Sequence, residues 1–319
     1  HGIRIPAGDY VLTVPGQGED LGVTGDLDIT SGSLNITGAG AGTTRIDAAG
    51  LDRVLDLQSG AKLELANLTI SGGATSSGEL GGGLRSRDAD LYLYQVTVDG
   101  NQASGEGGGL AATSNTMLSI VDARFTQNQA TLGGGGIYLD DSSSAMVSTV
   151  QVDNNTSTDA DGGGLLSTGS VAILDSSVHD NSANNGGGAF LYHEATIDHV
   201  LFHDNQTTGS GDGAALYISG DSDDNGQFHV ATATIYDNFS YNNGGGVVVT
   251  GIAKIVNSTI SDNIAMQHGG GIVTDDSTAN LTLLSNTITN NRVGGSGGGL
   301  SRRSGTISLG NTIVAGNNA

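Results

Sequence analysis

The sequence predicts an all-β fold, a right-handed parallel β-helix (solenoid) with about 25 residues in each coil. Glycine triplets, each followed by a small or aliphatic residue, recur at intervals of 24 to 33 residues. Short β-branched segments separate them, and helical periodicity is missing throughout. Such a repeat is typical of a solenoid, whose coils bury apolar side chains against one another. The triplets begin at Gly81, Gly107, Gly134, Gly162, Gly186, Gly244, Gly269 and Gly297, and Gly211-Asp212-Gly213 is an imperfect copy.

A five-residue register run fixes the alignment of the repeats. The runs are 97–101, 124–128, 151–155, 177–181, 201–205, 234–238, 259–263 and 287–291. The second position is always Val, Ile or Phe, which suits an inward-facing strand residue. The fifth is always Asn, which tolerates the left-handed conformation that a tight corner needs. Stacked amides can donate and accept, so we expect a structural ladder. Its members are Asn101, Asn128, Asn155, Asn181, Asn205, Asn238, Asn263 and Asn291.

We expect one β-helix domain over residues 1–319, because a solenoid lengthens by adding coils. We expect irregular first coils over residues 1–78 and regular coils over residues 79–319. Residues 220–226, within the longest repeat, predict a projecting loop. Neither end carries a recognisable cap, so we expect an excerpt of a longer protein or, less favoured, ends that stack on other molecules.

Charge and composition exclude several classes of function. The chain has 33 acidic and 11 basic residues, a net charge of −22, which argues against binding nucleic acid or an anionic membrane. It has no cysteine, which excludes disulfides, thiolate catalysis and Cys-ligated metals. No apolar run is long enough to span a membrane.

The fourth register position places an acidic residue on four consecutive coils, at Asp180, Asp204, Asp237 and Asp262. Carboxylates at a spacing of roughly 4.8 Å repel one another unless a cation lies between them. Hard oxygen ligands favour calcium, so these residues are a candidate calcium site. We favour the alternative that Asp suits the corner before Asn and points into solvent. The predicted cofactor is therefore none, or calcium.

The third register position offers candidate catalytic residues, His179, His203 and Tyr236, on consecutive coils. A His/Tyr couple beside carboxylates can perform β-elimination on a uronic acid, with His or Tyr as base and Tyr as acid. However, this column faces outward, and residues 125–253 contain no Arg or Lys to partner the acidic row.

Several segments resemble known families. Phe125-Thr126-Gln127-Asn128 and Gly134-Gly135-Gly136-Ile137 resemble the FxxN and GGA(I/L/V) repeats of polymorphic outer-membrane proteins. Residues 5–13 and 25–30 are similar to bacterial secreted proteins with a CSLREA region. The resemblance implies an extracellular or bacterial cell-surface location, and a host or cell-surface ligand as partner.

These observations together favour a non-enzymatic structural or adhesive β-helix, stabilised by calcium and assembling end to end into a filament. The alternative is a polysaccharide lyase or glycoside hydrolase acting on an extracellular polysaccharide, with a lyase as the expected type if the chain is an enzyme. A catalytic role would require a groove with converging His, Tyr and carboxylate side chains, whereas an adhesin would have a flat wall.

Overall fold

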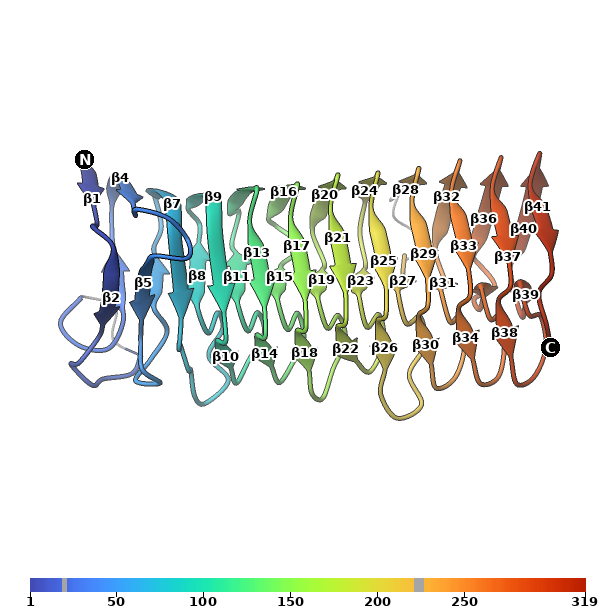
Figure 1. Ribbon diagram of the computed structural model, residues 1–319, viewed down its shortest axis with the longest axis horizontal. Coiled ribbons are helices and arrows are strands. Elements are labelled where there is room, and N and C mark those ends of the chain that lie inside the picture. Colours follow the sequence, from blue (N-terminus) through green and yellow to red (C-terminus); the bar gives the residue numbers. More distant parts are fainter. Residues whose placement is uncertain (19–21, 221–226) are drawn as a thin grey trace.

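The computed structural model describes residues 1–18, 22–220 and 227–319, and every regular element in these ranges is a β-strand. Figure 1 shows the strands stacked along one long axis, with the termini at opposite ends. Each regular coil passes through three sheets, and neighbouring coils pair in parallel. The predicted parallel β-helix is confirmed.

The largest sheet, sheet A, receives two consecutive strands from each regular coil, separated by a bend. In the early coils β7 and β9 continue through this bend. The strands of sheet A are β1 (Gly2–Arg4), β2 (Gly8–Val11), β4 (Gly32–Thr37), β5 (Thr44–Asp47), β7 (Ala61–Ser71), β9 (Asp90–Asp99), β12 (Met117–Val121), β13 (Arg124–Thr126), β16 (Ser144–Ser148), β17 (Gln151–Asp153), β20 (Ser170–Leu174), β21 (Ser177–His179), β24 (Ala195–Asp198), β25 (Leu201–His203), β28 (Gln227–Ala231), β29 (Thr234–Tyr236), β32 (Ile252–Val256), β33 (Thr259–Ser261), β36 (Asn280–Leu284), β37 (Thr287–Thr289), β40 (Thr306–Gly310) and β41 (Ile313–Ala315).

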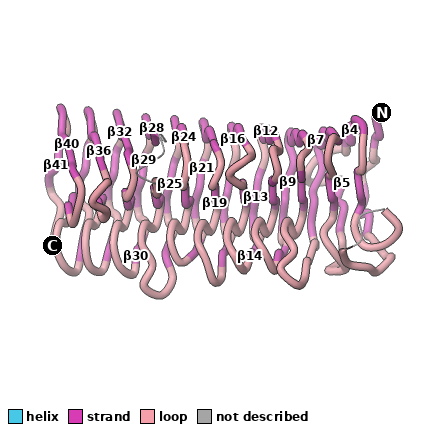
Figure 2. The backbone as a smooth tube through the Cα atoms, turned by 180° about the vertical axis from the view of Figure 1, so that it is seen from behind, coloured by secondary structure: helices cyan, strands magenta, loops and turns pink. Residues whose placement is uncertain are grey.

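Two smaller sheets complete each coil. Sheet C follows the Asn corner and has two-residue strands: β10 (Gln102–Ala103), β14 (Gln129–Ala130), β18 (Thr156–Ser157), β22 (Ser182–Ala183), β26 (Gln206–Thr207), β30 (Phe239–Ser240), β34 (Ile264–Ala265) and β38 (Arg292–Val293). Sheet B follows the glycine triplets: β3 (Leu27–Ile29), β6 (Leu55–Leu57), β8 (Leu84–Arg87), β11 (Leu110–Thr113), β15 (Ile137–Leu139), β19 (Leu165–Ser167), β23 (Ala189–Leu191), β27 (Leu216–Ile218), β31 (Val247–Val249), β35 (Ile272–Thr274) and β39 (Leu300–Arg302). Seen from behind, the loops gather along one edge of the solenoid (Figure 2).

The core is the narrow interior of the coil. The second residues of the register runs all point into it, and none is more than 2% exposed. Burying one such side chain stabilises the fold by roughly 1.5–3 kcal/mol. They are Val98, Phe125, Val152, Val178, Phe202, Ile235, Ile260 and Ile288.

The Asn side chains at the fifth position lie inside the corner and connect successive coils. Each of the eight is at most 1% exposed. Asn205 is typical: its Nδ2 donates to Asn238 Oδ1 at 3.0 Å and to the carbonyl of Val178 at 2.9 Å. Its own Oδ1 accepts from the Nδ2 of Asn181 at 3.0 Å and from the backbone N–H of Asn181 at 3.1 Å. The amides therefore satisfy backbone groups that water cannot reach.

The conformation of the corner differs from the expectation. The residue with positive φ is the fourth of the run and not the Asn: φ is 55° at Asp180, 54° at Asp204 and 58° at Asp262. The fourth residue turns the chain, because the Asn side chain must stay inside the corner to hydrogen-bond the Asn of the next coil. Asp and Asn are the non-glycine residues that tolerate this conformation best.

Glycine triplets serve two purposes. The first Gly turns the chain, with φ 70° at Gly107. A Cβ on the second, Gly108, would lie 2.4 Å from backbone atoms of Gln129 and Gly135, so only glycine allows this approach of the coils.

The first coils join sheets A and B and add buried ion pairs. Arg53 Nη1 lies 2.9 Å from Asp26 Oδ2, and both residues are almost completely buried. The predicted loop at 220–226 falls, from residue 221 on, outside the described residues. Within the described ranges the structure holds no helix that could cross a membrane.

Candidate functional site

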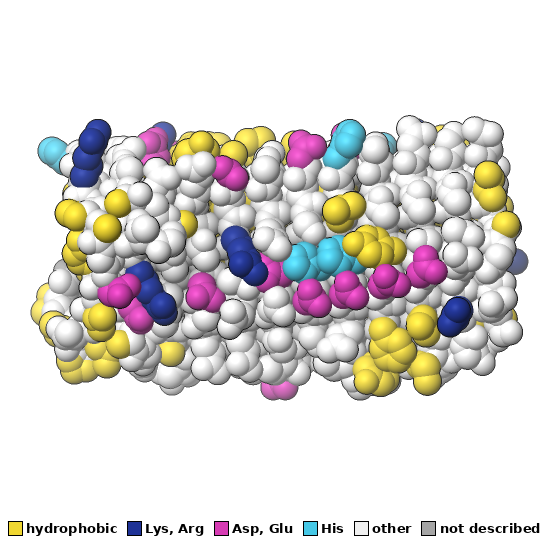
Figure 3. Space-filling model, viewed as in Figure 1, with side chains coloured by type: hydrophobic (Ala, Val, Ile, Leu, Met, Phe, Trp, Pro, Cys, Tyr) yellow, Lys and Arg dark blue, Asp and Glu magenta, His cyan; other side chains and the backbone are white. Residues whose placement is uncertain are grey.

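The acidic row runs along the corner between sheets A and C. Its members Asp180, Asp204, Asp237 and Asp262 follow one another on consecutive coils, and Figure 3 shows acidic side chains in a line beside the histidines. About half of the side chain is exposed at Asp180 (49%) and Asp204 (53%). Among the described residues no group of three or more His, Cys, Asp or Glu is arranged to hold a metal ion. A calcium site here stays a prediction.

The third register position forms a stack of rings next to this row. The His179 and His203 ring centroids are 4.6 Å apart with an interplanar angle of 7°. Tyr236 continues the stack, 4.9 Å from His203 at 16°. The histidine side chains are only 14% and 19% exposed, because each ring covers its neighbour. Strand pairing between β21, β25 and β29 sets this spacing.

Each histidine of the stack is hydrogen-bonded to the carboxylate that follows it. His179 Nδ1 lies 2.7 Å from Asp180 Oδ2, and His203 Nδ1 lies 2.8 Å from Asp204 Oδ2. A carboxylate only accepts, so the Nδ1 proton is assigned to the ring. Nε2 of His179 is 2.8 Å from the Gln151 amide, whereas no described residue hydrogen-bonds Nε2 of His203. The two rings therefore differ in accessibility to a ligand.

The end of the stack holds two groups that keep their protons more firmly than usual. Burial raises the pKa of Tyr236, and the carboxylates of Asp204 and Asp237 add to the rise. Asp237 is exposed, and slight burial of its carboxyl also raises its pKa, with further contributions from Asp204 and Asp262 and an opposing one from His203. Asp237 is therefore a candidate proton donor.

The sequence did not predict an ion pair at the other end of the stack. Arg124 Nε and Nη2 each lie 2.8 Å from a carboxylate oxygen of Asp153, which is fully buried. Burial alone would raise the pKa of Asp153, but hydrogen bonds from Arg124, Asn154 and Thr126 hold it below its ordinary value. The signal was present: Arg occupies the first position of one run and Asp the third position of the next.

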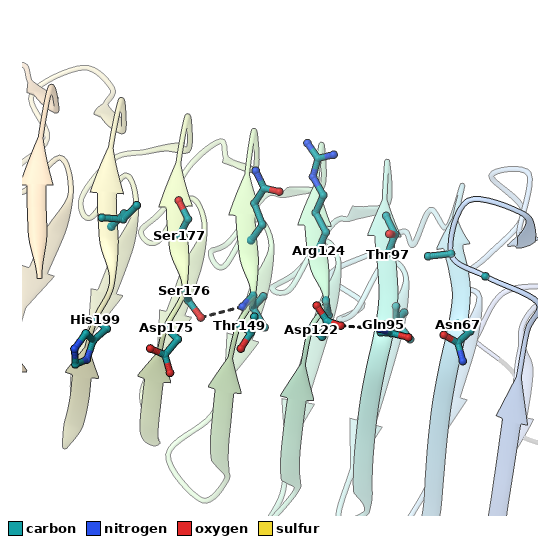
Figure 4. Close-up of a pocket in the computed structure, with 17 residues that line it drawn as sticks. Asn67, Gln95, Thr97, Asp122, Arg124, Thr149, Asp175, Ser176, Ser177 and His199 are labelled. Atoms are coloured by element: carbon teal, nitrogen blue, oxygen red, sulfur yellow. Dashed lines mark hydrogen bonds between the residues drawn. The ribbon is translucent and has the colours of Figure 1, made fainter.

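A groove of about 870 Å³ runs across sheet A beside the stack. Figure 4 shows its lining side chains arranged in two rows on consecutive coils. One row consists of bend residues with positive φ, namely Asn67, Gln95, Asp122, Thr149, Asp175 and His199. The other consists of first register positions, namely Thr97, Arg124, Gln151, Ser177 and Leu201. The groove and the stack share strands, because Leu201 begins β25 and His203 ends it.

Sheet B carries a second column of functional side-chain types. The rings of Phe190 and Tyr217 stack at 4.7 Å with an angle of 12°. Beside them, burial raises the pKa of Asp161 and Asp212. These carboxylates are already hydrogen-bonded within the wall: Asp161 accepts from the Asn185 side chain at 2.9 Å, and Asp212 from a backbone N–H at 2.8 Å. They stabilise the turns before the glycine triplets.

Residues 56–235 match the right-handed β-helix region family. The chain belongs to this family. The match covers more than half of the sequence and identifies the confirmed parallel β-helix as right-handed. It does not test the resemblance to polymorphic outer-membrane or CSLREA-region proteins. Comparison with curated proteins finds no sequence match.

Two solved structures of Azotobacter vinelandii enzymes are similar to this right-handed β-helix. The A-module of mannuronan C-5 epimerase AlgE4 aligns with a TM-score of 0.62 at 17% identity, covering 99% of this chain and 87% of that one. The A-module of mannuronan C-5 epimerase AlgE6 aligns with a TM-score of 0.59 at 16% identity, covering 99% and 91%. Identities this low establish a common fold.

These comparisons contradict the prediction of a non-enzymatic structural or adhesive β-helix. The similar structures are polysaccharide-modifying enzymes, which supports the alternative of an enzyme that acts on a polysaccharide. The error has a physical reason. The repeated residues form the core and corners that every coil shares. A reaction needs a few surface side chains on two or three coils, and these need not be repeated.

Proposed function

We propose that the chain is a glycoside hydrolase that cleaves an uncharged extracellular polysaccharide at the Asp204–Asp237 pair. The observation that carries this proposal is the contrast between two carboxyls on neighbouring coils. Asp237 has a raised pKa, whereas Asp204 accepts a hydrogen bond from His203 Nδ1 at 2.8 Å. Two carboxyls in contrasting environments are the usual arrangement for glycosidic cleavage.

The spacing of the pair suits a double displacement. Strand pairing places the two residues on neighbouring coils, whose backbones are ~4.8 Å apart. Carboxyls borne at this spacing can reach the separation of about 5–5.5 Å found in retaining glycosidases. Asp237 donates its proton to the glycosidic oxygen as Asp204 bonds to the anomeric carbon and the glycosidic bond breaks. Water then displaces Asp204, and Asp237 takes the proton from that water.

His203 and Tyr236 position this pair. The hydrogen bond from His203 Nδ1 holds the Asp204 carboxylate in place. The Tyr236 ring, stacked on His203, holds the imidazole in this orientation. Because its pKa is raised, the Tyr236 phenol remains protonated and can donate a hydrogen bond to a sugar hydroxyl.

Charge favours an uncharged substrate. A uronate polymer would bring one carboxylate per sugar to a wall that already carries Asp180, Asp204, Asp237 and Asp262. Arg124, the basic residue nearest in sequence before the pair, is already bound to Asp153 through two hydrogen bonds. We place the enzyme outside the cytoplasm, where polysaccharides occur.

The test is release of new reducing ends from a panel of uncharged polysaccharides (cellulose, laminarin, xylan and mannan), with polymannuronate and polygalacturonate as charged comparisons. We expect release from an uncharged polymer, with retention of anomeric configuration in the first product by NMR. No release from uncharged polymers together with an ultraviolet-absorbing unsaturated product from a uronate would overturn the proposal. That outcome would assign elimination to the His203–Tyr236 pair.

A further inference from the structure

The groove on sheet A is longer than a cleavage site needs, and it lies to one side of the proposed pair. Its bend residues run over consecutive coils from Asn67 to His199. Six coils are separated by five steps of ~4.8 Å, or about 24 Å, a length of about five sugar units. Asp204 lies on the last of these coils and Asp237 on the next coil beyond.

The chemistry of the lining suits hydroxyl groups. Gln95, Thr97, Thr149 and Ser177 offer uncharged donors and acceptors, and the exposed alkyl side chain of Leu201 adds an apolar surface. Such a mixture of amide, hydroxyl and small apolar groups suits the polar edges and apolar faces of sugar rings.

The groove contains four charged or titratable side chains; Arg124, Asp122 and His199 have partners within the protein, and the fourth is the carboxylate of Asp175. Arg124 is bound to Asp153, and Asp122 Oδ2 accepts from Gln95 Nε2 at 2.8 Å. His199 Nδ1 lies 3.0 Å from Asp198. An uncharged ligand fits this lining better than a polyanion, for which the groove presents one already paired guanidinium.

We infer that the groove binds about five consecutive sugars of a linear uncharged polysaccharide on one side of the Asp204–Asp237 pair. The direction in which the sugar chain extends from the cleaved bond rests on the proposed hydrolysis. Binding itself rests on the groove alone. Because contacts lie on one side, oligosaccharides are expected to be cut at one preferred bond near one end. Sugars far from that bond contribute binding energy that accelerates its cleavage.

The experiment uses oligosaccharides of increasing length, labelled at the reducing end, from the uncharged polymer that is cleaved. We expect kcat/KM to rise with length until about five sugars fill the groove and then to level off. Gln95→Ala, on the second coil from the far end of the groove, is expected to lower kcat/KM by about tenfold for long substrates and hardly for the shortest. Gln267→Ala, at an exposed glutamine outside the groove, is the matched control.

Binding is measured separately, by calorimetry with Asp237→Asn protein and cello-, laminari-, xylo- and manno-oligosaccharides. Length-dependent binding that Gln95→Ala weakens would support the groove even if no polymer is hydrolysed, and would leave only the proposed reaction refuted. Hydrolysis with a kcat/KM that depends neither on oligosaccharide length nor on Gln95→Ala would overturn the groove inference alone. Absence of binding in this series would also overturn it.

Discussion

Single residues at the corner decide both structure and chemistry. The fourth register position needs a left-handed backbone, and Asp is among the few side chains that accept it. Backbone geometry therefore accounts for Asp at this position, and a calcium site there stays a prediction. The chemistry comes from what surrounds each copy: Asp204 is paired with a histidine and Asp237 is not.

Asp26 predicts how stability depends on pH. Burial raises the pKa of this carboxyl from 3.8 to about 7, although Arg53 opposes the shift. The folded state then binds more protons than the unfolded state between these two values. Asp26 stabilises the fold fully below the lower value. Between the two values its contribution falls by at most about 1.4 kcal/mol per pH unit, and it is lost once the pH has risen through the higher value.

Urea unfolding at about pH 5 and about pH 8 measures this effect. We expect a lower free energy of unfolding at the higher pH and a smaller difference in Asp26→Asn, which cannot titrate. Burial also raises the pKa of Asp161 and Asp212, which act in the same direction. A free energy of unfolding that does not change with pH, or a pH dependence that Asp26→Asn leaves unchanged, would contradict this account of Asp26 and Arg53.

At the scale of elements, the corner between sheets A and C depends on the amide ladder. A strand of two residues such as β26 has few backbone hydrogen bonds of its own. The Asn side chains add hydrogen bonds between coils at a point where the backbone turns. The sequence predicted the ladder residues from their invariant position, but not which residue carries the positive φ.

Asn205→Ala is expected to destabilise the protein by about 2–4 kcal/mol, because it removes the buried amide that serves the Val178 carbonyl and both the backbone and the side-chain N–H groups of Asn181. The measurement is the midpoint of urea unfolding. Asn280→Ala, at an exposed position of β36, controls for loss of an amide in general. Equal midpoints for the two variants would show that the buried amide contributes nothing special.

At the scale of the whole molecule, the sequence predicted the solenoid well and its active face incompletely. Period and register placed His179, His203 and Tyr236 on consecutive coils, and they form one stack. The groove was missed because its bend row has no sequence signature: Asn67, Gln95 and Thr149 share a φ value and not a residue type.

The predicted function failed for a related reason. Family repeats describe how coils stack, and the same coils can carry a bare wall or an active site. Only coordinates reveal that a groove, a ring stack and unequal carboxyls lie on one face of sheet A. This concentration on one face is what a binding site needs and what a stalk does not.

The most direct test of the central claim compares kcat/KM of Asp237→Asn, Asp204→Asn and Asp180→Asn on the polysaccharide that the native protein cleaves. All three variants place Asn in a left-handed corner that Asn tolerates, so all should fold. We predict a loss of about 10²–10⁴-fold for Asp237→Asn and Asp204→Asn, and less than about tenfold for Asp180→Asn. Near-native activity of Asp237→Asn, or an equal loss in all three variants, would contradict the assignment of the Asp204–Asp237 pair.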